Sequence, residues 1–169
     1  MAYREILDRV TPQIQQNLTG VERQTFVGRL VADFPQEDRD VLQETVNGLL
    51  GQMPAKNASD IDLGGAGCGG RIWYRIYGEK KPDEAVGPFT EDETDVMFHS
   101  LLMESQRTYL FEHRNLDFSY TLQQDGQEHR YRADLYFDLD HLALNMRYIE
   151  IEIRPFKGLD FPPNVVRAI

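Results

Sequence analysis

The sequence predicts an α+β fold in which helices pack on an antiparallel sheet. Apolar residues recur at helical spacing over residues 3–50, and sheet-forming patterns occupy residues 59–63 and 71–77 and then the region 118–153. A further helical pattern separates residues 71–77 from the region 118–153. The 169 residues, 41% of them hydrophobic, are enough to build a packed core.

Two or three short helices are expected over residues 3–50. Thr19 and Glu22 have the spacing of a capping box, in which each side chain binds a free amide at the helix start, so we predict a helix beginning at Gly20. Gly51 and Pro54 are expected to end the last helix.

Strands are predicted at residues 59–63 and 71–77, where β-branched and aromatic residues alternate. The five glycines between positions 64 and 70 predict a flexible strand connection. Residues 78–89 carry two prolines and several charges, which favours a loop.

A second helical region should follow this loop. Thr90 and Glu93 form another capping box, and the apolar pattern behind it continues to about Phe111. An antiparallel meander is then expected: strands over 118–122 and 128–137 joined by a tight Asp125-Gly126 turn, and a last strand over 142–153.

Composition excludes several classes of partner. The chain carries 28 acidic and 18 basic residues, and its net charge of −10 repels phosphate backbones and anionic lipid headgroups. We therefore expect no nucleic-acid binding and no direct membrane insertion. Cys68 is the single cysteine, and the first residues lack the apolar segment of a signal peptide, so the expected location is the cytoplasm.

No catalytic centre is expected in this chain. The glycine cluster resembles a phosphate-binding loop, but that motif requires a Gly-Lys pair, which the chain does not contain. Asp138, Asp140 and His141 could supply ligands to a metal ion, although a solvated turn between strands is the favoured interpretation. We therefore predict no metal site, and a metal-dependent enzyme using these three residues stays open as an alternative.

Three arginines form the candidate functional site. Arg130 and Arg132 share one face of a predicted strand, and Arg147 lies on the next strand. A hairpin can therefore hold their guanidinium groups side by side, an arrangement that binds phosphate on a neighbouring subunit. The alternative is that these arginines form ordinary surface ion pairs with nearby acids.

Five short segments resemble, in the same order, the N-terminal domain of PilT and GspE type motor ATPases, over about residues 55–169. They are Ala58-Ser59-Asp60-Ile61-Asp62-Leu63, Arg75 with Gly78, Asp117-Phe118-Ser119-Tyr120, Arg130-Tyr131-Arg132-Ala133-Asp134 followed by Arg147, and Leu159-Asp160-Phe161-Pro162-Pro163-Asn164-Val165-Val166. Three positions depart from the family pattern: Asp62 replaces a histidine, Leu139 falls where the family has an arginine, and no proline follows Ile149.

The resemblance implies a PAS-like domain that packs on the ATPase domain of the same or the adjacent subunit in a hexamer. Carried over by position, the arginines that approach nucleotide across the subunit boundary are Arg132 and Arg147, with Arg130 beside them. ATP and magnesium would be bound by the ATPase domain, and no cofactor is expected in this chain. A platform protein of the bacterial inner membrane is a further expected partner.

Together these interpretations give three regions and one main function. We predict a helical N-terminal extension over residues 1–53, a PAS-like domain over 54–158, and the start of a linker to an ATPase domain over 159–169. The predicted role is a non-catalytic regulatory and coupling domain of a motor for type IV pilus twitching motility or for type II or type IV secretion. The alternative is a stand-alone PAS-like sensor or protein-interaction module.

Overall fold

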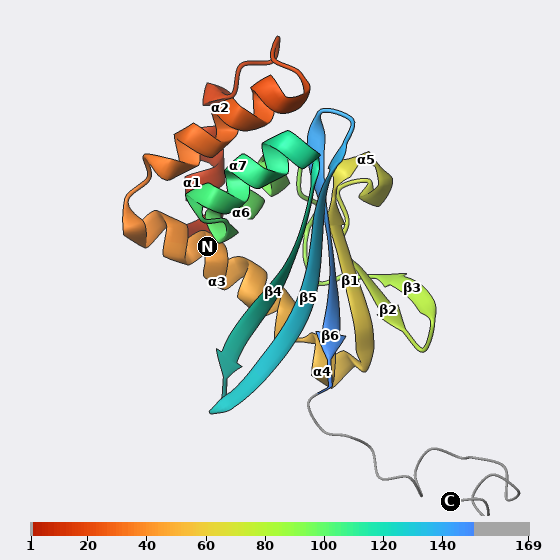
Figure 1. Ribbon diagram of the computed structural model, residues 1–169. Coiled ribbons are helices and arrows are strands. Elements are labelled where there is room, and N and C mark those ends of the chain that lie inside the picture. The colour runs from red at the N-terminus through yellow and green to blue at the C-terminus, as the bar shows by residue number, and fades with distance from the viewer. Residues whose placement is uncertain (1, 151–169) are drawn as a thin grey trace, which may run out of the picture.

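The computed structural model describes residues 2–150, whose longer helices all lie on one side of a sheet (Figure 1). The elements, in chain order, are α1 (Ala2–Val10), the 3-10 turn η1 (Thr11–Gln13), α2 (Gly20–Ala32), α3 (Gln36–Leu50), α4 (Met53–Lys56), β1 (Ala58–Gly64), α5 (Gly65–Cys68), β2 (Trp73–Ile76), β3 (Glu79–Pro82), α6 (Glu91–Leu101), α7 (Glu104–His113), β4 (Asn115–Gln124), β5 (Gln127–Asp138) and β6 (His141–Ile149). None of the helices among the described residues is long and apolar enough to cross a membrane.

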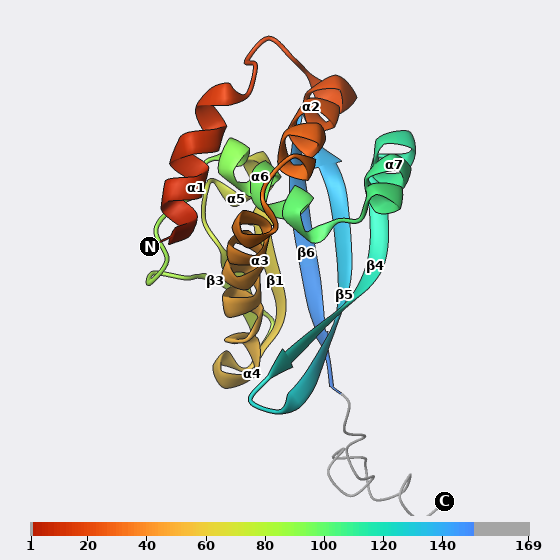
Figure 2. The same cartoon turned by 90° about the vertical axis from the view of Figure 1, so that its left-hand side faces the viewer.

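The sheet has six strands in the order β3-β2-β1-β6-β5-β4, and every neighbouring pair is antiparallel. β1 and β6 are adjacent at the centre although more than 70 residues of sequence separate them. Helices α1, α2, α3, α6 and α7 lie on one side of the sheet, whereas the short helix α5 lies at one end of the other side (Figures 1 and 2). The predicted α+β class with an antiparallel sheet and packing helices is confirmed.

One hydrophobic core joins the N-terminal helices to the sheet. Its buried side chains come from both parts and include Leu7, Val27, Leu50, Ile61 and Leu135. Two buried tyrosines of the sheet also donate hydrogen bonds to the end of α3: Tyr74 to the Leu49 carbonyl at 2.8 Å, and Tyr131 to the Leu50 carbonyl at 3.1 Å. The boundary between residues 1–53 and 54–158 stays a prediction, and the expected linker at 159–169 lies outside the described residues.

The predicted start of α2 at Gly20 is confirmed, but the capping box that predicted it is wrong. The Thr19 side chain makes no capping hydrogen bond. The Gly20 amide instead donates to Asp140 Oδ1 at 2.8 Å, so the turn between β5 and β6 supplies the oxygen. The predicted end of α3 is confirmed, because the helix stops at Leu50 with Gly51 as its C-cap. Pro54 lies in the first turn of the separate short helix α4, where a missing amide is tolerated.

The helix predicted from residue 90 to about Phe111 is two helices. The capping box of Thr90 and Glu93 is present as predicted, but α6 ends at Leu101 and α7 begins at Glu104. The Arg107 guanidinium donates 2.9 Å hydrogen bonds to the carbonyls of His99 and Leu102. This side chain satisfies backbone acceptors at the end of α6 and so stabilises the break.

Three other boundaries differ from the prediction. Residues 79–82 of the predicted loop form strand β3, because Tyr77 and Gly78 both have positive φ and turn the chain tightly. The glycine connection contains the short helix α5. β6 ends at Ile149, and the predicted continuation to Ile153 lies outside the described residues.

Candidate functional site

Arg132 and Arg147 lie directly opposite each other on β5 and β6. Their Cα atoms form a register pair, and Asp60 on β1 pairs with Arg147 on its other side. Arg75 on β2 pairs with Asp60 in turn. The four residues therefore form a row across the sheet, which we call the arginine row (Arg75, Asp60, Arg147 and Arg132). It lies on the face opposite the large helices, because the neighbouring residues Tyr131 and Met146 point into the core.

The arginines of the arginine row are exposed to solvent, whereas Asp60 beneath them is buried. The side chains of Arg132 and Arg147 are 71% and 63% exposed, whereas that of Asp60 is only 4% exposed. Arg147 Nε donates to Asp60 Oδ1 at 2.8 Å, and Arg75 Nε lies 3.6 Å from Asp60 Oδ2. Arg132 is held more loosely, by one 3.3 Å bond from its terminal nitrogen to Asp117.

Arg130 lies two residues from Arg132 on the same face. Its Nε donates to Glu128 at 2.7 Å, and its side chain is 63% exposed. Arg130 and Arg132 line a hollow of about 580 Å³ together with Asp117, Ser119, Thr121 and Ile149. The structure thus brings all three predicted arginines onto one exposed surface, and each also has the acidic partner that the surface ion-pair alternative expects.

A second polar cluster, buried between the helices and the sheet, was not predicted from the sequence. Asp95 on α6 is fully buried and accepts three hydrogen bonds: from Gln24 Nε2 at 2.7 Å, from the Leu142 amide at 2.8 Å and from His141 Nδ1 at 2.8 Å. The Gln24 amide nitrogen also lies 2.9 Å from the Asp140 carbonyl. This buried polar network therefore connects α2, α6 and the β5–β6 turn.

His99 completes the network on its apolar side. It is fully buried, and burial lowers its pKa to about 3, so the ring is neutral at ordinary pH. Gln24 Oε1 lies 3.0 Å from His99 Nε2. Because the Gln24 amide nitrogen donates to Asp95 and to the Asp140 carbonyl, its oxygen is the acceptor, and His99 must carry its hydrogen on Nε2.

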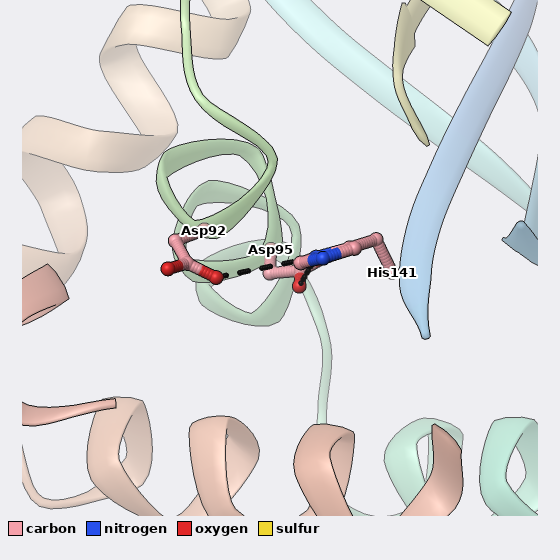
Figure 3. A group of neighbouring side chains, drawn as sticks. All are labelled: Asp92, Asp95 and His141. Carbon is pink, nitrogen blue, oxygen red and sulfur yellow. Dashed lines mark hydrogen bonds and ion pairs between the residues drawn. The ribbon is translucent and has the colours of Figure 1, made fainter. Parts of the chain in front are cut away.

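Asp92, Asp95 and His141 are close enough together to suggest a metal site (Figure 3). Their electrostatic partners explain the cluster without an ion. The buried Arg23 side chain pairs with Asp92, and His141 Nδ1 donates to Asp95 while Nε2 lies 3.4 Å from Glu91. The carboxylates of Asp92 and Asp95 are thus bound by donors of the protein itself, and His141 lies between acidic side chains.

The three metal ligands suggested by the sequence are not brought together. Asp138 accepts a hydrogen bond from the Gly67 amide, and Asp140 accepts one from the Gly20 amide. His141 turns toward Asp95 and Asp92 on α6 (Figure 3). The alternative of a metal-dependent enzyme built on Asp138, Asp140 and His141 is therefore not supported by the geometry.

We expect His141 to make stability depend on pH. Its hydrogen bond to Asp95 raises the pKa of His141, with burial opposing and Glu91 adding to the rise. A histidine with a raised pKa in the folded state contributes its full stabilisation below the ordinary pKa of about 6.5. That stabilisation is lost as the pH rises through the pKa of the folded state. The stability lost on His141→Gln should therefore be larger at about pH 6 than at about pH 9.

Chemical denaturation of both proteins at the two pH values measures this difference. His113→Gln is the matched control, because His113 is exposed on α7 and stacks on Tyr109. An effect of His141→Gln that is the same at both pH values would contradict the expectation.

Comparisons with known proteins give matches in structure only. Neither a protein-family model nor a curated protein matches the sequence. The pilus retraction motor PilT, solved with bound ADP, matches with a TM-score of 0.57 and 28% identity over 72% of this chain and 34% of that one. The predicted resemblance is confirmed.

Two further solved structures, both of the ATPase DotB, share the fold of this chain. The ATPase DotB of Legionella pneumophila matches with a TM-score of 0.61 and 20% identity, over 75% of this chain and 34% of that one. DotB of Yersinia pseudotuberculosis matches with a TM-score of 0.56 and 16% identity, over 72% and 34%. The chain spans about a third of the length of these ATPases, an extent consistent with an N-terminal domain.

Within residues 2–150, the motor-ATPase motifs quoted above lie on strands of the sheet, except Gly78 in the β2–β3 turn, and the fifth segment lies outside the described residues. Asp60 comes from the first segment, Arg132 from the fourth, and β1 and β5 carry them onto the same face. Leu139, which stands where the family has an arginine, is 77% exposed in the β5–β6 turn with a positive φ. Because Leu139 lies in this turn and not on a strand, it is not part of the arginine row.

Proposed function

We propose that this chain is a non-catalytic regulatory and coupling domain of a motor ATPase that serves type IV pili or secretion. The domain packs on the ATPase domain of the same or the neighbouring subunit, in the cytoplasm. There Arg132 and Arg147, with Arg130 beside them, stabilise the phosphates of a nucleotide bound by the other domain. Movement of the sheet against the ATPase domain then couples nucleotide occupancy to rigid-body motion.

The observation that carries this proposal is the direct cross-strand pairing of Arg132 and Arg147 on an exposed face. Like charges that face each other on neighbouring strands destabilise a sheet. A bound anion removes that cost, and an arginine supplied from outside a nucleotide site is known to stabilise the charge of a phosphoryl group in transfer. The likeness to PilT, a motor solved with ADP, supports nucleotide as the anion.

Arginine variants mixed with the ATPase domain of a PilT-type motor test the proposal. The domain alone should hydrolyse no ATP. Added to the ATPase domain, the wild-type chain should raise turnover, and Arg132→Ala or Arg147→Ala should lower that stimulated turnover by roughly tenfold or more. Arg29→Ala is the matched control, since Arg29 is an exposed arginine of α2 on the helical side.

Arg132→Ala and Arg29→Ala should keep the thermal midpoint of the wild type within a few degrees, because the substituted side chains are exposed. Arg147→Ala also removes the partner of the buried Asp60 and should lower the midpoint, so turnover is compared at a temperature where every variant is folded. Unchanged turnover in both Arg132→Ala and Arg147→Ala would remove the proposed site. ATP hydrolysis by the isolated, purified chain would overturn the non-catalytic role.

A further inference from the structure

Among the described residues, Asp60 differs from the other acids on the open face of the sheet because its whole side chain is buried. Its side chain is 4% exposed, yet it lies at the centre of the arginine row, between Arg75 and Arg147. Asp117, which pairs with Arg132, is 57% exposed. A buried carboxylate persists only when it is paired and hydrogen-bonded, so Asp60 has a defined structural task under this surface.

The contact between Asp60 and Arg147 fixes one part of the guanidinium and leaves the rest available. Asp60 Oδ1 accepts from Nε at 2.8 Å, and Asp60 Oδ2 accepts from Ser59 Oγ at 2.7 Å. Within residues 2–150, the two terminal nitrogens of Arg147 have no hydrogen-bond partner. Four N–H donors of a guanidinium held at its Nε edge therefore remain for a ligand.

Arg75 is engaged differently. Its Nε lies 3.6 Å from Asp60 Oδ2, and one of its terminal nitrogens donates to the Gly78 carbonyl at 3.2 Å. Arg75 therefore contacts Asp60 from the β2 side and is itself fixed by a hydrogen bond to the β2–β3 turn. The buried carboxylate is thus held between two strands and cannot swing away from Arg147 without losing both contacts.

We propose that Asp60 is a positioning residue that orients Arg147 for a phosphate group. This inference rests on the proposed function and names the residue that prepares its site. A guanidinium already held in one orientation loses less conformational entropy on binding, so the paired Arg132 and Arg147 present a preorganised fork to a polyanion. Asp60 touches no ligand itself and acts through Arg147.

Arginine side-chain NMR on the unmodified chain tests the contact directly. The Nε hydrogen of Arg147 should exchange with solvent about tenfold more slowly than that of Arg132, whose Nε has no partner within residues 2–150. Asp60→Ala should abolish the difference, and Asp60→Asn, which keeps one acceptor oxygen, should restore part of it. Equal exchange rates in the wild type would overturn the positioning role, whatever the variants do.

A double-mutant cycle with the ATPase domain of a PilT-type motor tests the function. Asp60→Ala should reduce stimulated turnover by roughly five- to thirtyfold, and adding it to Arg147→Ala should cost nothing further, because both changes disable the same guanidinium. Asp134→Ala is the matched control: this acid of β5 accepts from Asn115, and within residues 2–150 it forms no hydrogen bond or ion pair with either arginine.

The outcomes separate this inference from the proposed function. If Arg147→Ala leaves turnover unchanged, the proposed function fails and the positioning role falls with it. If Arg147→Ala lowers turnover but Asp60→Ala does not, or if the Asp60→Ala loss persists in the double variant, only the positioning role is overturned.

Discussion

Replacing Asp95 by alanine should destabilise the fold by about 3–5 kcal/mol. Asp95 is fully buried and accepts hydrogen bonds from His141, Gln24 and the Leu142 amide. The alanine leaves the buried Leu142 amide without its acceptor and takes one acceptor from Gln24 and one from the half-buried His141. Each buried unsatisfied group costs about 1–3 kcal/mol. Equilibrium denaturation in urea at neutral pH, followed by circular dichroism, measures the loss.

Asp117→Ala is the matched control for this measurement. Asp117 is also an aspartate with one ionic partner, but its side chain is 57% exposed and its bond to Arg132 is 3.3 Å long. Its removal should change the free energy of unfolding by no more than about 0.5–1 kcal/mol. Similar losses for the two variants would show that Asp95 does not organise the buried polar network.

The local features of the fold could be predicted because they depend on residues close in sequence. The Asp125-Gly126 dipeptide predicts the β4–β5 turn, and both residues have the positive φ that such a turn needs. The Thr90 and Glu93 capping box likewise forms as predicted. In contrast, the start of α2 is capped by Asp140, 120 residues away, and no local pattern reveals such a partner.

The arginine row could be predicted in part. Strand alternation places Arg130 and Arg132 on one face, and the hairpin makes Arg147 their neighbour. The role of Asp60 could not be predicted in this way, because strand alternation does not reveal which of several acids on a polar face lies buried under an arginine.

The buried polar network was missed although its sequence carries a signal. Asp95 and His99 are four residues apart, so they lie on the same face of α6, and both are fully buried in a helix whose Met97 and Phe98 also lie in the core. Polar residues with this spacing inside an apolar helix predict partners from another element. Which partners they are depends on the packing of α2 and the β5–β6 turn, and that follows only from the tertiary structure.

Gly64→Ala is expected to be at least as damaging as Asp95→Ala, for a different reason. Gly64 ends β1 with φ +76° and ψ 176°, a conformation that is essentially restricted to glycine and costs other residues about 1–3 kcal/mol. A Cβ atom there would also lie 2.5 Å from the buried Phe98 ring and 2.7 Å from the Leu142 carbonyl oxygen. Because the second obstacle is backbone of the central strand β6, a side-chain rotation cannot relieve it.

We therefore expect Gly64→Ala to lower the free energy of unfolding by more than about 3 kcal/mol, or to prevent folding at 37 °C. Gly48→Ala is the control with the opposite sign. Gly48 lies within α3 at ordinary helical φ, and an added Cβ meets no atom within 4 Å. The Gly48→Ala substitution should stabilise the chain by roughly 0.5–1 kcal/mol, since alanine is a better helix former than glycine. Thermal unfolding of the two variants beside the wild type distinguishes these outcomes, and equal midpoints for Gly64→Ala and the wild type would show that β1 can shift away from β6 at this position.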